Sequence, residues 1–197
     1  MTTDTLDTAS PEDPDDESRR DFIHIGAAAF GAVTIGGVVW PLIDQMNPDQ
    51  SVLALATIEV DISSIEVGQS VVVKWRGKPV FIRHRTAEEI AEARAVPLVD
   101  LPDQLADNQG LPDDTPANDE NRAIKEQYLI MIGICTHLGC IPLGLDDAGY
   151  AGEFGGWFCP CHGSHYDTSG RIRKGPAPRN LDIPPYEFIE DAVIRIG

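Results

Sequence analysis

The chain has 197 residues, of which 42% are hydrophobic, and a mean hydropathy of −0.15, so it has room for one medium-sized domain and is not a polytopic membrane protein. Its formal net charge of −17 at pH 7 repels phosphate backbones, which argues against nucleic-acid binding. All four cysteines lie within residues 135–161, beside histidines. Such clustering indicates a metal site more than a disulfide framework.

The first 21 residues are rich in Asp, Glu, Pro, Ser and Thr and offer almost nothing to bury. We therefore predict that residues 1–21 form a disordered cytoplasmic tail. The tail runs into Ser-Arg-Arg-Asp-Phe at residues 18–22, which resembles a twin-arginine export signal. Simple positive-inside flanking is the alternative interpretation, and it predicts the same orientation.

Residues 22–43 carry no charge, and as a helix rising about 1.5 Å per residue they span the roughly 30 Å hydrocarbon core of a bilayer. A buried core helix is one alternative, and a signal cleaved after the Ala-Leu-Ala at residues 54–56 is another. The run is longer than the roughly 7–15 apolar residues of a typical signal, so we expect a single uncleaved transmembrane helix. Residues 44–56, which include Pro48, are predicted to be a flexible hinge.

The remainder, residues 57–197, is predicted to be one mostly β domain. Hydrophobic and polar residues alternate over residues 57–62, as in a half-buried strand, and β-rich segments flank Arg76-Gly77-Lys78, as in a hairpin. Residues 128–134 read as a buried strand that leads into the first cysteine. The predicted strands lie at residues 57–62, 70–75, 79–83, 128–134, 187–189 and 193–196.

Two segments interrupt this β pattern. Thr86 and Glu89 have the spacing of a capping box, so a short helix is predicted to run to about Ala95. Residues 96–127 are long, acidic and rich in proline, and we expect them to be an insertion lying over the domain surface.

Two sequence boxes carry the chemistry: Cys-Thr-His-Leu-Gly-Cys at residues 135–140 and Cys-Pro-Cys-His-Gly-Ser-His-Tyr at residues 159–166. A structural zinc site accepts two cysteines and two histidines, but finger-type sites usually pair cysteine with cysteine and histidine with histidine. Here each box supplies one cysteine and one histidine, so one iron can take two thiolates and another two imidazoles. The predicted metal ligands are Cys135, His137, Cys159 and His162.

These boxes, the Gly-Pro-Ala-Pro at residues 175–178 and the anchor with its connector resemble the Rieske iron–sulfur subunits of the bacterial cytochrome bc1 complex, or ubiquinol–cytochrome c reductase. The resemblance implies an antiparallel β Rieske domain with a small cluster-binding subdomain at about residues 129–182. It also implies a [2Fe–2S] cofactor, with Cys135 and Cys159 on the buried iron and His137 and His162 on the solvent-facing iron.

From the residues alone, Cys140 and Cys161 are free thiols in a cytosolic protein or a pair in an exported one. The resemblance implies that they form a disulfide, which the loop-entropy model values at about 3 kcal/mol for a loop of about 20 residues. It further implies that Ser164 contacts a bridging sulfide and Tyr166 contacts the sulfur of Cys135. Hydroxyl donors of this kind stabilise the reduced cluster and raise its potential.

The resemblance implies a membrane-bound oxidoreductase subunit. Ubiquinol would be oxidised at a site shared with cytochrome b, with a proton passing to His137 or His162 and an electron passing on to cytochrome c1. The expected setting is a dimeric complex in the bacterial inner membrane, with its anchor in lipid and its cluster domain periplasmic. The alternatives are a soluble Rieske ferredoxin, a structural zinc module, and the Rieske subunit of a b6f-type or menaquinol complex.

Overall fold

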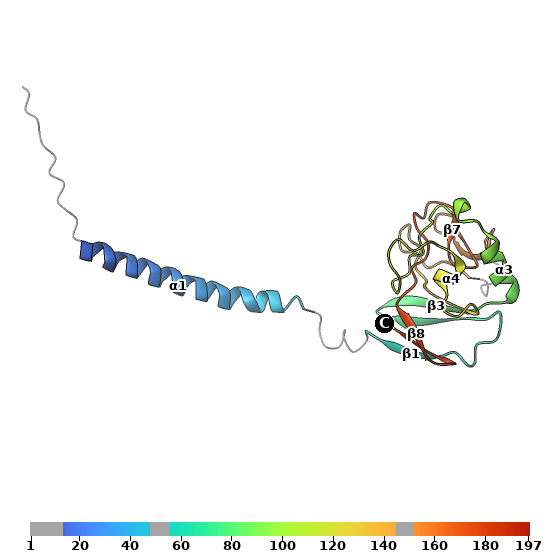
Figure 1. The fold of residues 1–197 in the computed structure, drawn as a ribbon, viewed down its shortest axis with the longest axis horizontal. Helices are drawn as coiled ribbons and strands as arrows, with labels where there is room; N and C mark the ends of the chain where they lie inside the picture. The colour runs from blue at the N-terminus through green and yellow to red at the C-terminus, as the bar shows by residue number, and fades with distance from the viewer. Residues whose placement is uncertain (1–13, 48–55, 145–151) are drawn as a thin grey trace, which may run out of the picture. The chain divides into compact units, whose positions relative to one another are not determined.

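The computed structural model describes residues 14–47, 56–144 and 152–197, and it divides into two compact units, Met1–Asp49 and Gln50–Gly197. The first unit contains the helix α1 and the second contains the β domain (Figure 1). Most of the predicted hinge, residues 48–55, lies outside the described residues, as do residues 1–13 of the predicted tail.

Helix α1 runs over Pro14–Asp44. Within it, Ser18–Asp44 is long and apolar enough to cross a membrane, with a mean hydropathy of 1.9 over its most apolar window. The helix begins before the predicted start at residue 22, so the end of the segment expected to be disordered is helical. Proline is favoured in the first turn of a helix, which suits a start at Pro14.

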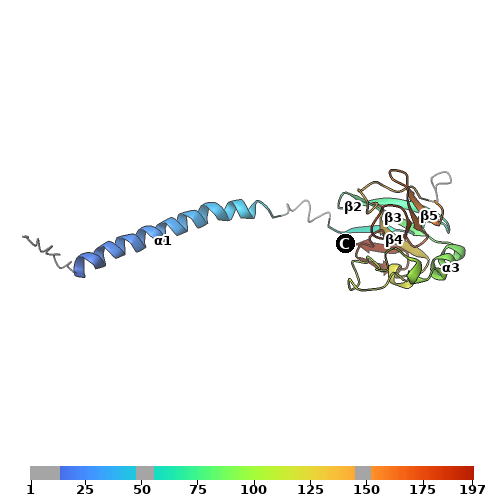
Figure 2. The same cartoon turned by 90° about the horizontal axis from the view of Figure 1, so that it is seen from above.

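In the described part of the chain the β domain contains three three-stranded sheets, in the orders β1-β9-β8, β2-β3-β4 and β5-β6-β7, and every strand pair is antiparallel (Figure 2). The predicted mostly β architecture is therefore confirmed. The strands are β1 Ile58–Asp61, β2 Ser70–Trp75, β3 Lys78–His84, β4 Tyr128–Ile132, β5 Gly155–Cys159, β6 Ser164–Asp167, β7 Ile172–Lys174, β8 Tyr186–Glu190 and β9 Val193–Ile196.

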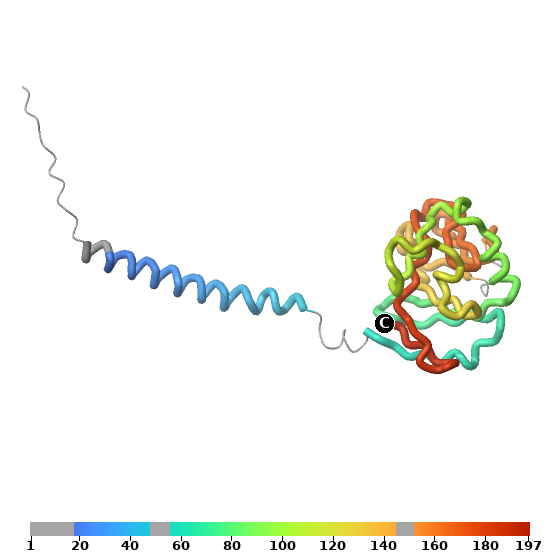
Figure 3. The backbone as a smooth tube through the Cα atoms, in the orientation of Figure 1, coloured from blue at the N-terminus to red at the C-terminus, as the bar shows by residue number. Residues whose placement is uncertain are grey.

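Local sequence explains several of these elements. Trp75 pairs with Lys78 across a two-residue turn in which Arg76 and Gly77 have φ values of 48° and 78°, the left-handed pair that a type I′ hairpin needs. The first and last strands of the domain pair, so the two ends of its chain lie side by side (Figure 3). Sequence had pointed to all of these strands except β5, β6 and β7, whose residues lie just before, within and after the second box.

The predicted capping box is present at the start of helix α3, Ala87–Ala95. The Glu89 N–H donates to Thr86 Oγ1 at 3.3 Å, and the Thr86 N–H donates to Glu89 Oε2 at 3.0 Å. Both donors belong to the group of N–H groups that a helix start leaves without an intrahelical partner. The short helix was therefore predicted with its correct start and end.

The sheet β2-β3-β4 separates two hydrophobic cores. Alternate residues of β3 and β4 face opposite ways: Ile82 and Ile130 pack with β1 and β9, whereas Phe81 and Met131 pack with Cys135, Cys159 and the sheet β5-β6-β7. Strand β4 is thus buried on both faces, as its unbroken apolar sequence predicted. One face of this sheet therefore packs against the cysteines of the two boxes.

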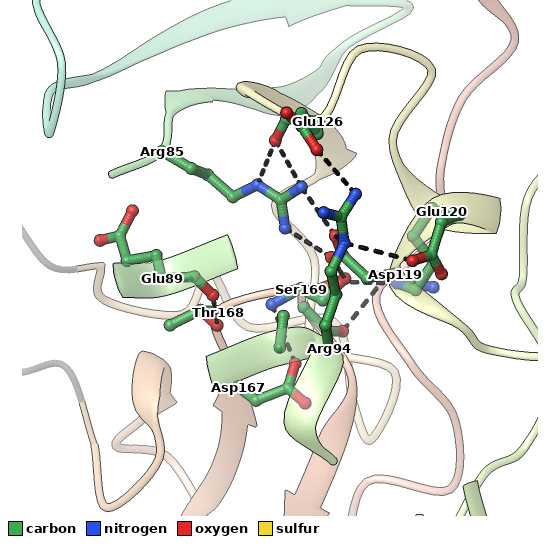
Figure 4. Close-up of polar contacts among 12 residues, drawn as sticks. Arg85, Glu89, Arg94, Asp119, Glu120, Glu126, Asp167, Thr168 and Ser169 are labelled. Atoms are coloured by element: carbon green, nitrogen blue, oxygen red, sulfur yellow. Dashed lines mark hydrogen bonds and ion pairs between the residues drawn. The ribbon is translucent and has the colours of Figure 1, made fainter. Parts of the chain in front are cut away.

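Most of residues 96–127 are exposed or partly exposed, as expected for a segment over the surface, but several of its residues enter the interior. It contains η1, Leu98–Asp100, and α4, Asp119–Arg122, and it sends Leu101, Ala106, Ala117 and Ala123 into the interior. Two buried charges, those of Asp119 and Arg85, account for the difference. Asp119 accepts from Arg85 and from the Ser169 hydroxyl, and these bonds join α4 to the end of β3 and to the turn after β6 (Figure 4).

Candidate metal centre

The two boxes form two tight loops. The first follows β4, and it closes where the Cys135 N–H donates to the Cys140 carbonyl at 2.8 Å and the Gly139 N–H donates to the Cys135 carbonyl at 3.0 Å. The second connects β5 to β6, with Cys159 paired to Ser164 across the hairpin. Each loop therefore presents its cysteine and histidine from the end of a strand.

The predicted ligands divide by burial into two pairs. Cys135 and Cys159 are each 2% exposed and their thiols contact one another, whereas His137 is half-buried and His162 is exposed. The two imidazole rings lie 4.6 Å apart between centroids, at 87° to one another. Burial raises the pKa of the Cys159 thiol, and the neighbouring Cys135 adds to the rise. A cation between the sulfurs would reverse this preference for the neutral thiol.

Cys140 and Cys161 form a disulfide, so the pairing implied by the resemblance is confirmed. The bond joins the first loop to the second. The sulfurs of Cys140, Cys159 and Cys161 all lie within 4.8 Å of one another, and the disulfide leaves Cys159 as the free thiol of the three. The disulfide thus packs directly beside one of the predicted metal ligands.

Two hydroxyl groups lie beneath the loops. The Tyr166 hydroxyl is completely buried and donates to Cys135 Sγ at 3.2 Å. Burial raises the pKa of Tyr166, with the contact to Cys135 adding to the rise, so the hydroxyl keeps its proton and remains a donor. The equally buried Ser164 Oγ accepts from the Ala177 N–H at 3.2 Å, a bond that does not use the serine's own hydrogen.

A third loop, residues 175–180, holds the other two in place. Gly175 has a φ of 109°, and a Cβ there would strike the backbone of Gly163 in the second loop, so only glycine allows this approach. The first loop is held by Thr136, whose hydroxyl donates to the Arg179 carbonyl at 2.7 Å and accepts from the Arg179 N–H at 3.3 Å. Sequence reasoning missed this contact, because nothing in the spacing of the boxes points to it.

The donors present fit a two-iron cluster with unlike ends. One end has two buried sulfurs and a hydroxyl donor, and the other has two accessible imidazoles, with one residue of each kind from each loop. Zinc fingers do not pair their ligands in this way. The fold and the site define an iron–sulfur protein of the Rieske type with an apolar N-terminal helix.

Comparison with known proteins agrees with this class. Residues 102–187 match the family described as "Rieske [2Fe-2S] domain", and residues 9–49 match "Ubiquitinol-cytochrome C reductase Fe-S subunit TAT signal". The ubiquinol-cytochrome c reductase iron-sulfur subunit of Rhodospirillum rubrum is 54% identical, covering 92% of this chain and 93% of that protein. The subunit of the same name from Rhodobacter capsulatus is 53% identical, covering 91% and 95%. A solved chain titled "Hyperthermophilic respiratory Complex III" has 29% identity and a TM-score of 0.47, covering 87% and 98%.

The chain belongs to the family of ubiquinol-cytochrome c reductase iron–sulfur subunits. It is an electron-transfer subunit of an oxidoreductase complex, its cofactor is a [2Fe–2S] cluster, and its apolar N-terminal helix is a membrane anchor. The fold class, the cofactor and the family expected from the sequence are confirmed. The Rieske family match begins at residue 102, so most of the acidic segment belongs to the Rieske domain.

Proposed function

We propose that Cys135 and Cys159 hold one iron of the cluster and that His137 and His162 hold the other. The observation that carries this proposal is a buried pair of free thiols beside an accessible pair of imidazoles, on two loops joined by a disulfide. When bound, such a cluster takes up and releases single electrons. The buried thiols keep water from the sulfur end, while the histidines place the other end at the protein surface.

The histidines give this electron carrier a path for protons. An imidazole that holds metal through one ring nitrogen has its second nitrogen free to accept a hydrogen bond and then a proton. The exposed His162 and the half-buried His137 can both be approached from outside. We propose that a docked quinol donates to one of them, so that its proton and its electron leave together.

The partners follow from this chemistry and from the family. We propose ubiquinol as the donor, at a site shared with cytochrome b, and cytochrome c1 as the acceptor. Leu138, 71% exposed, lies between the histidine and the disulfide cysteine of the first loop, and we propose that it and the exposed Gly175, Pro176 and Pro178 flank the histidines where the partners dock. A b6f-type or menaquinol complex remains the alternative setting.

The membrane arrangement is part of the same proposal. The anchor lies in the lipid of the bacterial inner membrane, with the N-terminus cytoplasmic, the cluster domain periplasmic and the complex dimeric. The paired Arg19 and Arg20 before the apolar run support this orientation. Residues 44–56 act as the hinge that lets the cluster meet quinol and cytochrome in turn.

Single replacements test the ligand set. Cys135→Ser, His137→Asn, Cys159→Ser and His162→Asn should each abolish the Rieske electron paramagnetic resonance signal and the bound iron. His165→Asn is the matched control, because His165 lies in the second box but packs against Phe158 and accepts from the Glu153 N–H. It should keep full iron content. Stoichiometric zinc without iron or acid-labile sulfide in the wild-type protein would contradict the proposal.

A further inference from the structure

The acidic segment, residues 96–127, forms hydrogen bonds to two neighbouring residues of the third loop. The Asn180 N–H donates to Asp103 Oδ2 at 2.9 Å, and Arg179 Nη1 donates to Asp107 Oδ1 at 3.1 Å. A backbone hydrogen bond adds to these contacts, since the Ile183 N–H donates to the Asp107 carbonyl at 2.8 Å. Two carboxyl groups of one segment therefore hold the two residues that follow the Gly-Pro-Ala-Pro sequence.

The two carboxyl groups have unequal sets of partners. Asp103 accepts backbone N–H bonds on both oxygens, from Leu105 at 3.1 Å and from Asn180 at 2.9 Å. The Asp107 side chain is only 11% exposed, and its Oδ2 is buried with no donor among the residues that the structure describes. The Asp103 carboxyl, another acceptor, lies close enough to the Asp107 carboxyl to interact with it through its side chain. A proton shared between the two carboxyl groups would give Asp107 Oδ2 a partner.

This pair is one residue away from the first cluster loop. The Arg179 side chain donates to Asp107. The Arg179 backbone forms two hydrogen bonds with the Thr136 hydroxyl, accepting one at its carbonyl and donating the other from its N–H. Thr136 lies between Cys135 and His137. A movement of Arg179 can therefore be passed through Thr136 to the two proposed ligands on either side of it.

We propose that Asp103 and Asp107 share one proton, and that the proton-bound pair positions Arg179 and, through Thr136, the first cluster loop. The inference rests on the proposed function, because Thr136 matters to the cluster only if its neighbours are ligands. It assigns a role to the acidic segment: it holds the third loop, and through it the first cluster loop, by contacts that weaken as the pH rises.

The charges around the pair set the direction of this dependence. Arg179 faces it and is shared with Asp182, Arg122 approaches from α4, and Asp113 lines the same pocket, whose volume is about 250 Å³. Burial raises the pKa of Asp107 to about 6, Asp103 adds to the rise, and Arg179 opposes it. The stability contributed by the pair is therefore full below the ordinary value of 3.8 and is lost as the pH rises through about 6.

Asp107→Asn tests the shared proton. The amide keeps an oxygen for Arg179 and donates to Asp103 at every pH, so it mimics the protonated carboxyl. In the cluster-loaded, full-length protein, the melting temperature of Asp107→Asn minus that of the wild type should rise by about 5 °C between pH 5 and pH 7.5. Asparagine also tolerates the left-handed φ of 47° better than aspartate, but that gain is the same at every pH and cancels in the comparison.

Asp182→Asn is the matched control, because it removes the other carboxyl partner of Arg179. Its melting temperature relative to the wild type should not change over the same pH range. If Asp107→Asn behaves like this control, no proton is shared and the proposal fails.

Hydrogen–deuterium exchange of residues 135–140, corrected for the intrinsic effect of pH, tests the positioning. Protection of this loop should fall with rising pH in the wild type and stay constant in Asp107→Asn. Protection that does not depend on pH in the wild type would overturn the positioning role. Neither readout uses the ligand assignment, so failure here and failure of the ligand replacements are distinguishable.

Discussion

Tyr166→Phe isolates the hydroxyl that donates to Cys135 Sγ at 3.2 Å. Phenylalanine keeps the ring in its fully buried position and removes only the O–H, so the fold and the cluster should remain. Reduction adds negative charge to the cluster and its sulfur ligands, and a hydrogen bond to a charged acceptor is roughly twice as strong as one to a neutral acceptor. The net value of a hydrogen bond is about 0.5–1.5 kcal/mol, so the reduced form should lose about 1 kcal/mol more than the oxidised form. For one electron, 59 mV corresponds to about 1.4 kcal/mol, so the midpoint potential should fall by about 40 mV.

The assay is a redox titration followed by electron paramagnetic resonance or circular dichroism, beside measurements of quinol oxidation, which should slow as the potential falls. Tyr186→Phe is the matched control, because its hydroxyl accepts from the Ile124 N–H at 2.9 Å, among residues that hold no proposed ligand. It should cost some stability and leave the potential unchanged. An unchanged potential in Tyr166→Phe, with full cluster content, would refute the argument that this hydroxyl stabilises the reduced state.

Two further outcomes are expected. Cys140→Ser removes the link between the two loops, so its cluster should be lost faster on warming than that of the wild type, which iron release measures; equal lifetimes would show that the disulfide is not needed to hold the loops. Replacing Val52 and Ala54 in the proposed hinge with proline should slow turnover from quinol to cytochrome while leaving cluster content and potential unchanged, and turnover at the wild-type rate would make the connector a passive spacer.

The sequence was most informative where a residue acts through its own chemistry or its immediate neighbours. Thr86 and Glu89 predicted a capping box because both partners lie within one helical turn. Arg76-Gly77-Lys78 between two β-rich segments predicted a hairpin, and the order of cysteine and histidine in each box predicted a Rieske site rather than a zinc finger. Each of these inferences needs only a few consecutive residues and a known local geometry.

The sequence was least informative where partners are distant in the chain. Strands β5, β6 and β7 are short and rich in glycine and polar residues, so their periodicity is weak, and the pairing of β6 with both neighbours holds them. The bond between Thr136 and Arg179 spans 43 residues. No local sequence pattern near either residue predicts the other as its partner, although this contact holds the first cluster loop.

Arg122 shows why composition alone did not predict the buried part of the acidic segment. Its guanidinium is fully buried and donates to the carbonyls of Ser169 and Leu181 at 2.7 Å each, to that of Gly170 at 3.3 Å and to that of Ala106. Burial lowers its pKa to about 10, which leaves it charged at neutral pH.

Leaving a buried charge or its partners unpaired costs about 3–5 kcal/mol, a large share of the roughly 5–15 kcal/mol by which a domain is stable. A segment that looks like solvated surface in composition therefore carries one of the stronger long-range contacts of the domain. The carbonyls of Ser169 and Gly170 belong to the turn after β6 and that of Leu181 follows the third loop, so Arg122 and the carboxyl pair both join the acidic segment to the parts of the chain next to the cluster loops. The proposed ligands are encoded in two short boxes, whereas the loops around them also bond to a segment that lies before both boxes in the sequence.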